Sequence, residues 1–204
     1  MKDIRGFLFY RLRFSLLKIN LILSTIFTMI SFFLKGVKLG KKCRFYGLLI
    51  SFRMEDSRIE IGDGCSFRSN FVSNLVGMNR KCIITTLSRN AVVSIGNNSG
   101  FSGTVIAAAG SIKIGNNVLC GANTTITDFD WHGIMPDKRR NPEKPVPVNI
   151  EDNVWIGLNC LILKGVTIGR NSVIGANSVV TKDIPENVVA AGNPCRIIKK
   201  IGAI

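Results

Sequence analysis

The chain has 204 residues, of which 46% are hydrophobic, and a formal net charge of +14 at pH 7. This hydrophobic content excludes a disordered chain, and the length suits one domain with a substantial core and a short appendage. The positive charge is compatible with nucleic acid, an anionic membrane surface or a phosphate-rich ligand, and by itself it does not choose among them.

The six cysteines form no CxxC pair and show no zinc-finger spacing. Four of them occupy positions of the repeat described below, where a small apolar side chain is required. We therefore expect buried free thiols and no metal site, in a reducing compartment where disulfides would not persist.

The first predicted element is a helix near the N-terminus. Residues 19–34 (INLILSTIFTMISFFL) carry no charge. Sixteen residues at ~1.5 Å each span roughly 24 Å, which is shorter than the ~30 Å hydrocarbon core of a bilayer. Basic residues flank the run on both sides: Lys2, Arg5, Arg11, Arg13 and Lys18 before it, and Lys35, Lys38, Lys41, Lys42 and Arg44 after it. Such flanks favour a helix that lies in one leaflet near anionic lipids.

A weak polar stripe runs along this helix, because Asn20, Ser24, Thr28 and Ser31 recur at helical spacing. The alternative to membrane association is a helix that packs on its own domain or on a sister subunit. We therefore divide the chain into an apolar and basic helical segment at 1–35, expected to associate with a membrane, and a domain at 36–204.

A repeat with a period of six follows the helical segment. It first shows as short runs of residues six apart: Leu39 and Phe45; Ile61 and Phe67; Ile95, Phe101 and Ala107; and, after a slip of one residue, Ile114, Cys120 and Ile126. It is clearest further on, where six residues in succession keep the spacing: Ile150, Ile156, Ile162, Ile168, Ile174 and Val180. Mostly small or branched residues stand four places after each of these: Val154, Cys160, Val166, Ser172, Ser178 and Ile184.

A period of six is neither the period of two of a strand nor the 3.6 of a helix. It is typical of flat β-segments joined by turns, three segments to each triangular coil, in which each coil covers the apolar interior of its neighbour. The repeat therefore predicts an all-β solenoid from Leu39 to Ile184, of about seven coils, with a short C-terminal tail. The spacing does not determine the handedness of the solenoid.

A segment rich in charge and proline interrupts the repeat at 127–149 (TDFDWHGIMPDKRRNPEKPVPVN). A loop that leaves a rigid solenoid is a natural place for a binding or catalytic group. This loop contains His132, the only histidine of the chain. A neutral imidazole can accept a proton from a hydroxyl group near neutral pH, which makes His132 a candidate general base.

Two stretches of the chain resemble known enzymes. The stretch PVNIEDNVWIGLNCLILKGVTIGRNSVIGANSVVTKDIPENVVAAGNPCRIIKKI resembles the C-terminal half of galactoside and maltose O-acetyltransferases. The upstream run IKIGNNVLCGANTTITDFDWHGIMPDKRRNP is similar to acetyltransferases of capsule, colanic acid and lipopolysaccharide biosynthesis. The resemblance implies a left-handed parallel β-helix, an exception to the usual right-handed crossover. It also implies acetyl-CoA as co-substrate and a homotrimer with active sites between adjacent subunits.

The resemblance also assigns roles to individual residues. It places the catalytic histidine at His132 and puts Trp155 beside the thioester and the acceptor, where an aromatic face would pack on a sugar ring. The alternative for Trp155 is that it only covers the edge of a coil. Asp128 and Asp130 precede the histidine, and either one could orient the imidazole or contact the acceptor. Capping or turn formation is an equal alternative for both carboxylates.

Coenzyme A requires backbone donors for its pantetheine amides and cations for its phosphates. The resemblance places Gly157 and Ala176 along the pantetheine. The residues implied at the nucleotide end are Thr181, Lys182, Arg196 and Lys199. Lysine and arginine form charge-assisted hydrogen bonds with phosphate, although exposed cations near a C-terminus are often only solvated.

The chain departs from the galactoside enzymes in two ways that concern the substrates. Leu158 stands where those enzymes carry a serine, which removes one polar contact. The sugar-contacting residues of their N-terminal half have no recognisable counterparts here, so neither galactoside nor maltose is implied as the acceptor. Arg140, with Lys138 and Arg139, could meet an acidic or phosphorylated acceptor, or form a solvated run of charge.

The sequence therefore predicts an acetyl-CoA-dependent sugar O-acetyltransferase of cell-surface polysaccharide or lipopolysaccharide biosynthesis. It is expected in the cytoplasm, at the inner face of the membrane, with no nucleic acid partner. The alternatives are an amino-sugar N-acetyltransferase, a serine acetyltransferase and a non-catalytic β-solenoid. A zinc hydratase on this scaffold requires three histidines, and the chain has one.

Overall fold

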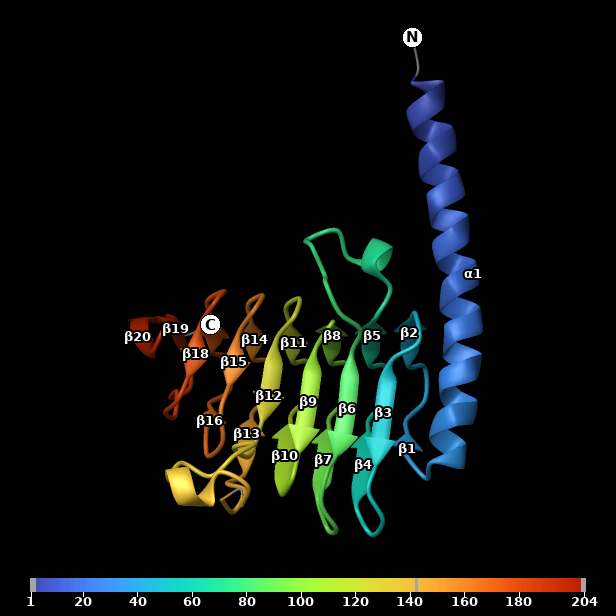
Figure 1. Ribbon diagram of the computed structural model, residues 1–204. Coiled ribbons are helices and arrows are strands. Elements are labelled where there is room, and N and C mark those ends of the chain that lie inside the picture. The colour runs from blue at the N-terminus through green and yellow to red at the C-terminus, as the bar shows by residue number, and fades with distance from the viewer. Residues whose placement is uncertain (1–2, 142, 203–204) are drawn as a thin grey trace.

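The chain forms a β-solenoid with one long helix beside its first coil, as the computed structural model in Figure 1 shows. The structure describes residues 3–141 and 143–202. Lys2 of the predicted basic flank, residue 142 of the predicted loop and residues 203–204 of the tail lie outside the described residues.

Three sheets of parallel strands form the walls of the solenoid. Sheet A contains β1 (Lys38–Leu39), β4 (Arg58–Ile61), β7 (Val92–Ile95), β10 (Ser111–Ile114), β13 (Val148–Ile150) and β16 (Thr167–Ile168). Sheet B contains β2 (Arg44–Tyr46), β5 (Ser66–Arg68), β8 (Gly100–Ser102), β11 (Leu119–Cys120), β14 (Trp155–Ile156), β17 (Val173–Ile174), β19 (Val188–Gly192) and β20 (Cys195–Lys200). Sheet C contains β3 (Ile50–Arg53), β6 (Ile83–Thr86), β9 (Val105–Ala108), β12 (Thr125–Thr127), β15 (Leu161–Ile162) and β18 (Val179–Val180).

The period-six residues line the interior, as predicted. Ile150, Ile156, Ile162, Ile168, Ile174 and Val180 have no exposed surface, and the residues four places after each are at most 4% exposed. Consecutive strands of each sheet pair in register, so every interior residue stacks on its counterpart one coil away. The stack contains six complete coils and the start of a seventh, where Ile184 bridges to Ile168. The arrangement is that of a left-handed β-helix. All six cysteines are free and buried, as expected.

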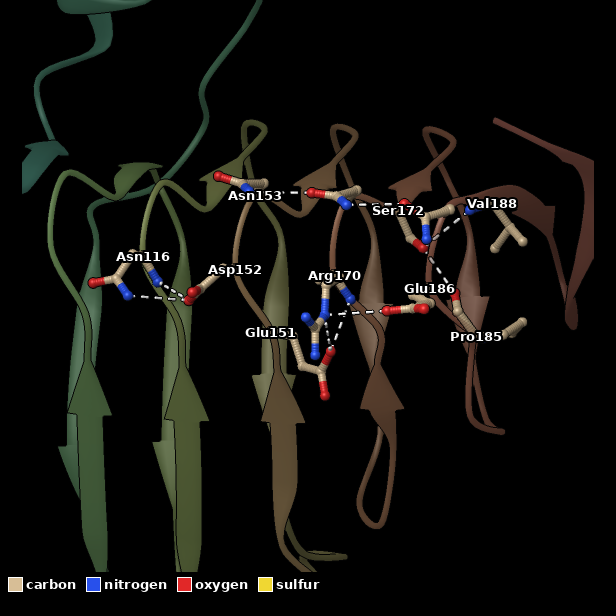
Figure 2. Close-up of polar contacts among 11 residues, drawn as sticks. Asn116, Glu151, Asp152, Asn153, Arg170, Ser172, Pro185, Glu186 and Val188 are labelled. Atoms are coloured by element: carbon tan, nitrogen blue, oxygen red, sulfur yellow. Dashed lines mark hydrogen bonds and ion pairs between the residues drawn. The ribbon is translucent and has the colours of Figure 1, made fainter. Parts of the chain in front are cut away.

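Asparagines form a ladder at the corner between sheets A and B. Asn117, Asn153 and Asn171 each donate from Nδ2 to Oδ1 of the asparagine one coil further on, over 2.8–3.1 Å, and the ladder ends at Asn187. Figure 2 shows the part that begins at Asn153, next to the ion pairs of Arg170 with Glu151 and Glu186. All four asparagines have φ near 60°. Asparagine tolerates this left-handed conformation better than most residues, which explains its recurrence at the turns.

Helix α1 (Ile4–Leu34) covers the open end of the first coil. Its buried residues are Ser24, Thr28 and Phe32, so part of the predicted polar stripe faces the solenoid rather than solvent. Phe32 packs edge-on against Phe45, with ring centroids 5.7 Å apart, and Phe45 continues the interior column of aromatic rings. The predicted segment 1–35 therefore shares a hydrophobic core with the domain that follows it.

Two loops interrupt the coils. The loop at 128–147, with a 3-10 turn at Pro136–Lys138, leaves the corner between sheets C and A and matches the predicted interruption. A second loop, 69–82, with a 3-10 turn at Phe71–Ser73, leaves the corner between sheets B and C. The period of six does not reveal this second loop. At the C-terminus, the antiparallel pair β19–β20 closes sheet B.

Candidate active site

The loop at 128–147 is fixed to the solenoid by Asp128. This carboxylate has no exposed surface, and its two oxygens accept hydrogen bonds from the backbone N–H groups of Ala109 and Gly110, each over 2.8 Å. The Asp128 carbonyl also accepts from the N–H of Val146, which closes the base of the loop. Asp128 is therefore a structural anchor, and the geometry favours the capping alternative over contact with an acceptor.

His132 lies on the exposed part of this loop. Its Nδ1 is 3.1 Å from the carbonyl oxygen of Arg139. A carbonyl can only accept, so this contact is a hydrogen bond when Nδ1 carries the proton, and Nε2 of the neutral ring then has a free lone pair. The turn is tight at the next residue, because a Cβ on Gly133 would overlap the Lys138 carbonyl oxygen. The loop thus orients the imidazole through its own backbone.

Asp130 forms an ion pair that the sequence analysis missed. Its Oδ2 lies 2.6 Å from Nζ of Lys164, which follows β15 on the next coil, and Lys164 also pairs with Glu143 at 3.1 Å. These two carboxylates, Asp130 first, raise the pKa of Lys164. Together, the two ion pairs connect the beginning and the end of the loop to the coil that contains β15. Lys164 stands within the repeat unit ILKGVT, where its charge is indistinguishable from a solvated one without knowledge of the neighbouring loop.

The two tryptophans of the chain are both exposed. Trp131, next to the histidine, is 60% exposed and packs against Phe129 with ring centroids 4.8 Å apart. Trp155 is 56% exposed on the outer face of sheet B, where it pairs with Leu119 and Val173 of the neighbouring strands. Both rings are available to a ligand, and neither is needed to fill the core.

Gly157 and Ala176 stack on each other at the corner between sheets B and C. A Cβ on Gly157 would lie 2.6 Å from the Ala176 backbone nitrogen, so only glycine fits this approach. Leu158 beside it is half-buried. Figure 1 shows that the turn from β14 to β15 and the loop at 128–147 lie at opposite ends of the sheet C strands. Gly157 and Ala176 are therefore at a different corner from His132.

The remaining predicted residues are exposed cations and a threonine. Thr181 and Lys182 follow β18 at the corner that carries the His132 loop, while Arg196 and Lys199 lie on the edge strand β20. Arg140 is exposed and forms no ion pair within residues 3–141 and 143–202. Within one chain, the structure thus brings Thr181 and Lys182 to the corner of His132. It leaves Trp155, Gly157, Ala176, Arg196 and Lys199 elsewhere on the solenoid.

Comparisons with known proteins agree with this architecture. The family model described as "Hexapeptide repeat of succinyl-transferase" matches residues 147–182. The crystal structure of a maltose O-acetyltransferase from Clostridium difficile is 34% identical, with a TM-score of 0.54 over 81% of this chain and 70% of that chain. The chain belongs to the hexapeptide-repeat acetyltransferase family.

Two further relatives bear on the activity of this family member. Galactoside O-acetyltransferase of Lactococcus lactis is 41% identical over 143 residues, which are 70% of this chain and 63% of that protein. A hexapeptide-repeat acetyltransferase of Vibrio cholerae, crystallised with acetyl coenzyme A, is 36% identical with a TM-score of 0.51. That match covers 54% of this chain and 61% of the Vibrio chain. The chain thus spans less than two thirds of each of these two relatives.

Proposed function

We propose that this chain is an acetyl-CoA-dependent O-acetyltransferase that modifies a sugar hydroxyl. The observation that carries the proposal is His132, held through Nδ1 by the Arg139 carbonyl on an anchored loop of a hexapeptide solenoid. The relatives from Lactococcus and Clostridium are named for O-acetylation of galactosides and maltose, and the Vibrio relative was crystallised with acetyl-CoA.

His132 supplies the proton transfer that the reaction requires. Nε2 accepts the proton of the acceptor hydroxyl while that oxygen attacks the carbonyl carbon of the thioester. The C–S bond then breaks, the acetyl group remains on the acceptor oxygen, and the proton leaves with the thiolate as the thiol of coenzyme A. The Arg139 carbonyl keeps the proton of the neutral ring on Nδ1 and stabilises the imidazolium formed at the intermediate stage.

The described residues fit coenzyme A as a substrate. Gly157 and Ala176 stack closely at a turn that carries no bulky side chain at these two positions, which suits the close approach of pantetheine. Lys182, next to Thr181, and Arg196, on the same strand as Lys199, are exposed at two places on the solenoid, and such cations can meet phosphate groups. In the proposal, the contact between subunits described next brings these two places together at the nucleotide end.

We also propose that the site is completed across a homotrimer interface. His132 and the Trp155 face lie on different sides of sheet C, and the outward row of sheet C is largely apolar: Ile50, Ile83, Val105, Thr125, Leu161 and Val179. The corresponding row of sheet A is polar: Lys38, Glu60, Ser94, Lys113, Asn149 and Thr167. The apolar row suits a subunit contact. A single-chain mass in sedimentation equilibrium would contradict the trimer.

The third part of the proposal is peripheral attachment to an anionic membrane surface on the cytoplasmic side, with a cell-surface polysaccharide or lipopolysaccharide precursor as acceptor. Helix α1 is long and apolar enough to cross a membrane, and 17% of its most apolar window is buried. Its contact with the first coil favours a helix that lies in the interface. A span would pull the charged residues Lys38, Lys41 and Lys42 toward hydrocarbon.

The decisive experiment compares His132→Ala with the wild-type chain. Release of free coenzyme A thiol is followed with acetyl-CoA and a panel of sugars, and acetyl-CoA binding is measured by calorimetry. Loss of a general base lowers kcat by ~10²–10⁴-fold and leaves acetyl-CoA binding nearly unchanged. Ile134→Ala, an exposed change in the same loop, is the matched control. Turnover of His132→Ala within a few-fold of wild type would refute the assignment.

A further inference from the structure

A groove with an apolar lining lies between the N-terminal half of helix α1 and the loop at 69–82. Its volume is about 570 Å³, within the range of small-molecule sites. Phe9, Leu12, Leu16 and Leu17 line it from the helix, and Val72 lines it from the loop. Figure 1 shows this part of the helix extending beyond the coils, on the side toward which the loop projects.

The groove continues the helix face that packs on the solenoid. Ser24, Thr28 and Phe32 bury this face against the first coil. At Asn20 and Leu16, about one and two turns before Ser24, the same face borders the groove instead. The helix is tied to the loop by a hydrogen bond from Arg13 Nη2 to the Val72 carbonyl oxygen, 3.0 Å long. The two walls of the groove are therefore fixed relative to each other.

The charges on the part of the helix that borders the groove favour an anionic amphiphile. Residues 4–20 contain four cations, Arg5, Arg11, Arg13 and Lys18, and no aspartate or glutamate. Arg13 lines the groove itself, and Nη2 is the only one of its guanidinium nitrogens with a hydrogen bond within the described residues. Asn20 also lines it, and its Oδ1 is buried without a hydrogen-bond partner among the described residues. An apolar channel with a cation on its wall offers burial for hydrocarbon and a charge-assisted contact for an anionic headgroup.

The surroundings of the groove are also apolar. Phe71, Leu75 and Val76 of the loop are 56–71% exposed, as is the outer face of the helix, where Leu8 is 61% exposed. The groove is therefore continuous with the surface proposed to meet the membrane. We propose that it binds one acyl chain of an anionic phospholipid, with Arg13 at the headgroup phosphate. This inference rests on the proposed membrane attachment and is independent of acetyl transfer.

Lipid retention tests the groove directly. The full chain is released from detergent micelles that contain palmitoyl-oleoyl phosphatidylglycerol or the matching phosphatidylcholine, and bound lipid is counted by native mass spectrometry. The wild-type chain should retain one phosphatidylglycerol per chain. Leu16→Trp and Val72→Trp fill the groove from its two walls, and each should reduce retention about tenfold or more by steric exclusion. Arg13→Gln should reduce the preference for phosphatidylglycerol over phosphatidylcholine.

Two controls separate the groove from the membrane surface. Ile22→Trp adds the same bulk to the exposed part of the helix, outside the groove, and should retain lipid like wild type. Sedimentation with phosphatidylglycerol vesicles measures membrane attachment separately, with a chain that lacks residues 1–18 as the negative reference. Equal retention in all variants, or vesicle binding without any retained lipid, would refute the groove proposal. A groove closed by a second copy of the chain would also retain no lipid and would refute it.

Discussion

The two loops that interrupt the solenoid differ in what they carry and resemble each other in how they are held. The loop at 128–147 bears charges and His132, whereas the loop at 69–82 presents Phe71, Leu75 and Val76. Asp128 fixes the first through two backbone N–H groups. Arg80 fixes the second by donating to the carbonyl oxygens of Gly103 and Asn123 and to the Thr125 hydroxyl.

The comparison shows how an inserted loop can be held to the coils of a β-solenoid. In both loops, one charged side chain forms hydrogen bonds with uncharged backbone or hydroxyl groups of neighbouring coils, so the anchor requires no charged partner. Both anchors meet at β12, because Arg80 binds Thr125 within that strand and Asp128 directly follows its end. The residues beyond the anchor are free to differ, and here one loop carries polar chemistry and the other an apolar surface.

Removal of the Asp128 anchor should have the largest effect. Asp128→Ala leaves two N–H groups without their acceptors, which lowers the free energy of unfolding by about 2–4 kcal/mol. Displacement of the loop should also lower kcat by about tenfold or more, since the base is no longer positioned. Thermal unfolding and thiol release measure the two effects. Asp128→Asn keeps one acceptor oxygen, so its losses of stability and of kcat should both be smaller than those of Asp128→Ala. An active, equally stable Asp128→Ala chain would contradict the anchoring role.

Removal of the Arg80 anchor should separate stability from activity. Arg80→Ala should cost about 1–3 kcal/mol, because two carbonyl groups and one hydroxyl lose a charged donor. Turnover of a small soluble sugar should stay within a few-fold of wild type, while vesicle binding weakens. Arg80→Met keeps the apolar stem and isolates the contribution of the guanidinium. A loss of kcat as large as that of Asp128→Ala would show that the two loops are not independent.

The proposed nucleotide-end cations should have an intermediate effect that is confined to one substrate. Lys182→Ala and Arg196→Ala should each raise KM for acetyl-CoA about three- to tenfold, with smaller changes in the acceptor KM, because a charge-assisted contact to phosphate is lost. Initial-rate kinetics with each substrate varied in turn provide the measurement. Lys200→Ala, a nearby change on β20, is the control. A change limited to the acceptor KM would place these residues on the other side of the site.

The Lys164 ion pairs should have the smallest effect. Lys164→Met removes pairs that are partly exposed, so the expected loss of stability is below about 1 kcal/mol. Since the folded state raises the pKa of Lys164 above its ordinary value of 10.5, the stabilisation is present below that pH and disappears as the pH rises beyond it. The difference in Tm from wild type should therefore be constant between pH 7 and pH 9 and shrink above pH 10.5. A difference that grows with alkalinity would contradict the pairing.

The sequence predicted the walls of the solenoid well because each interior residue meets a copy of itself one coil away. Residues six apart take the same inward position on successive walls, and every third one returns to the same wall one coil on, so the buried series from Ile150 to Val180 keeps the period. The 127–149 interruption was also visible, since prolines and charges cannot continue the pattern. The 69–82 loop was not, because its apolar residues resemble those of a strand and only their lack of register distinguishes them.

The sequence predicted the candidate site where a residue type occurs once in the chain. It did not predict the roles of side chains whose contacts come from other coils. His132 stands out as the single histidine. Asp128 and Asp130 have the same side chain two positions apart, yet one is buried against Ala109 and the other is paired with Lys164. The two aspartates differ because Asp128 contacts the preceding coil and Asp130 contacts the next one. The sequence around them does not indicate these contacts. The distance between His132 and Gly157 likewise depends on the triangular cross-section of the coils.

Helix α1 at one end of the stack and the β19–β20 hairpin at the other limit the end-to-end association of separate molecules. A parallel solenoid without end caps offers the same unpaired edge that its own coils use, so copies could add end to end into a filament. Here Phe32 covers the first coil, and the edge strand β20 carries Arg196, Lys199 and Lys200, whose like charges repel a second copy. Because helix α1 and strand β20 differ from the repeating coils, neither end of the stack offers the open parallel edge that another coil would need.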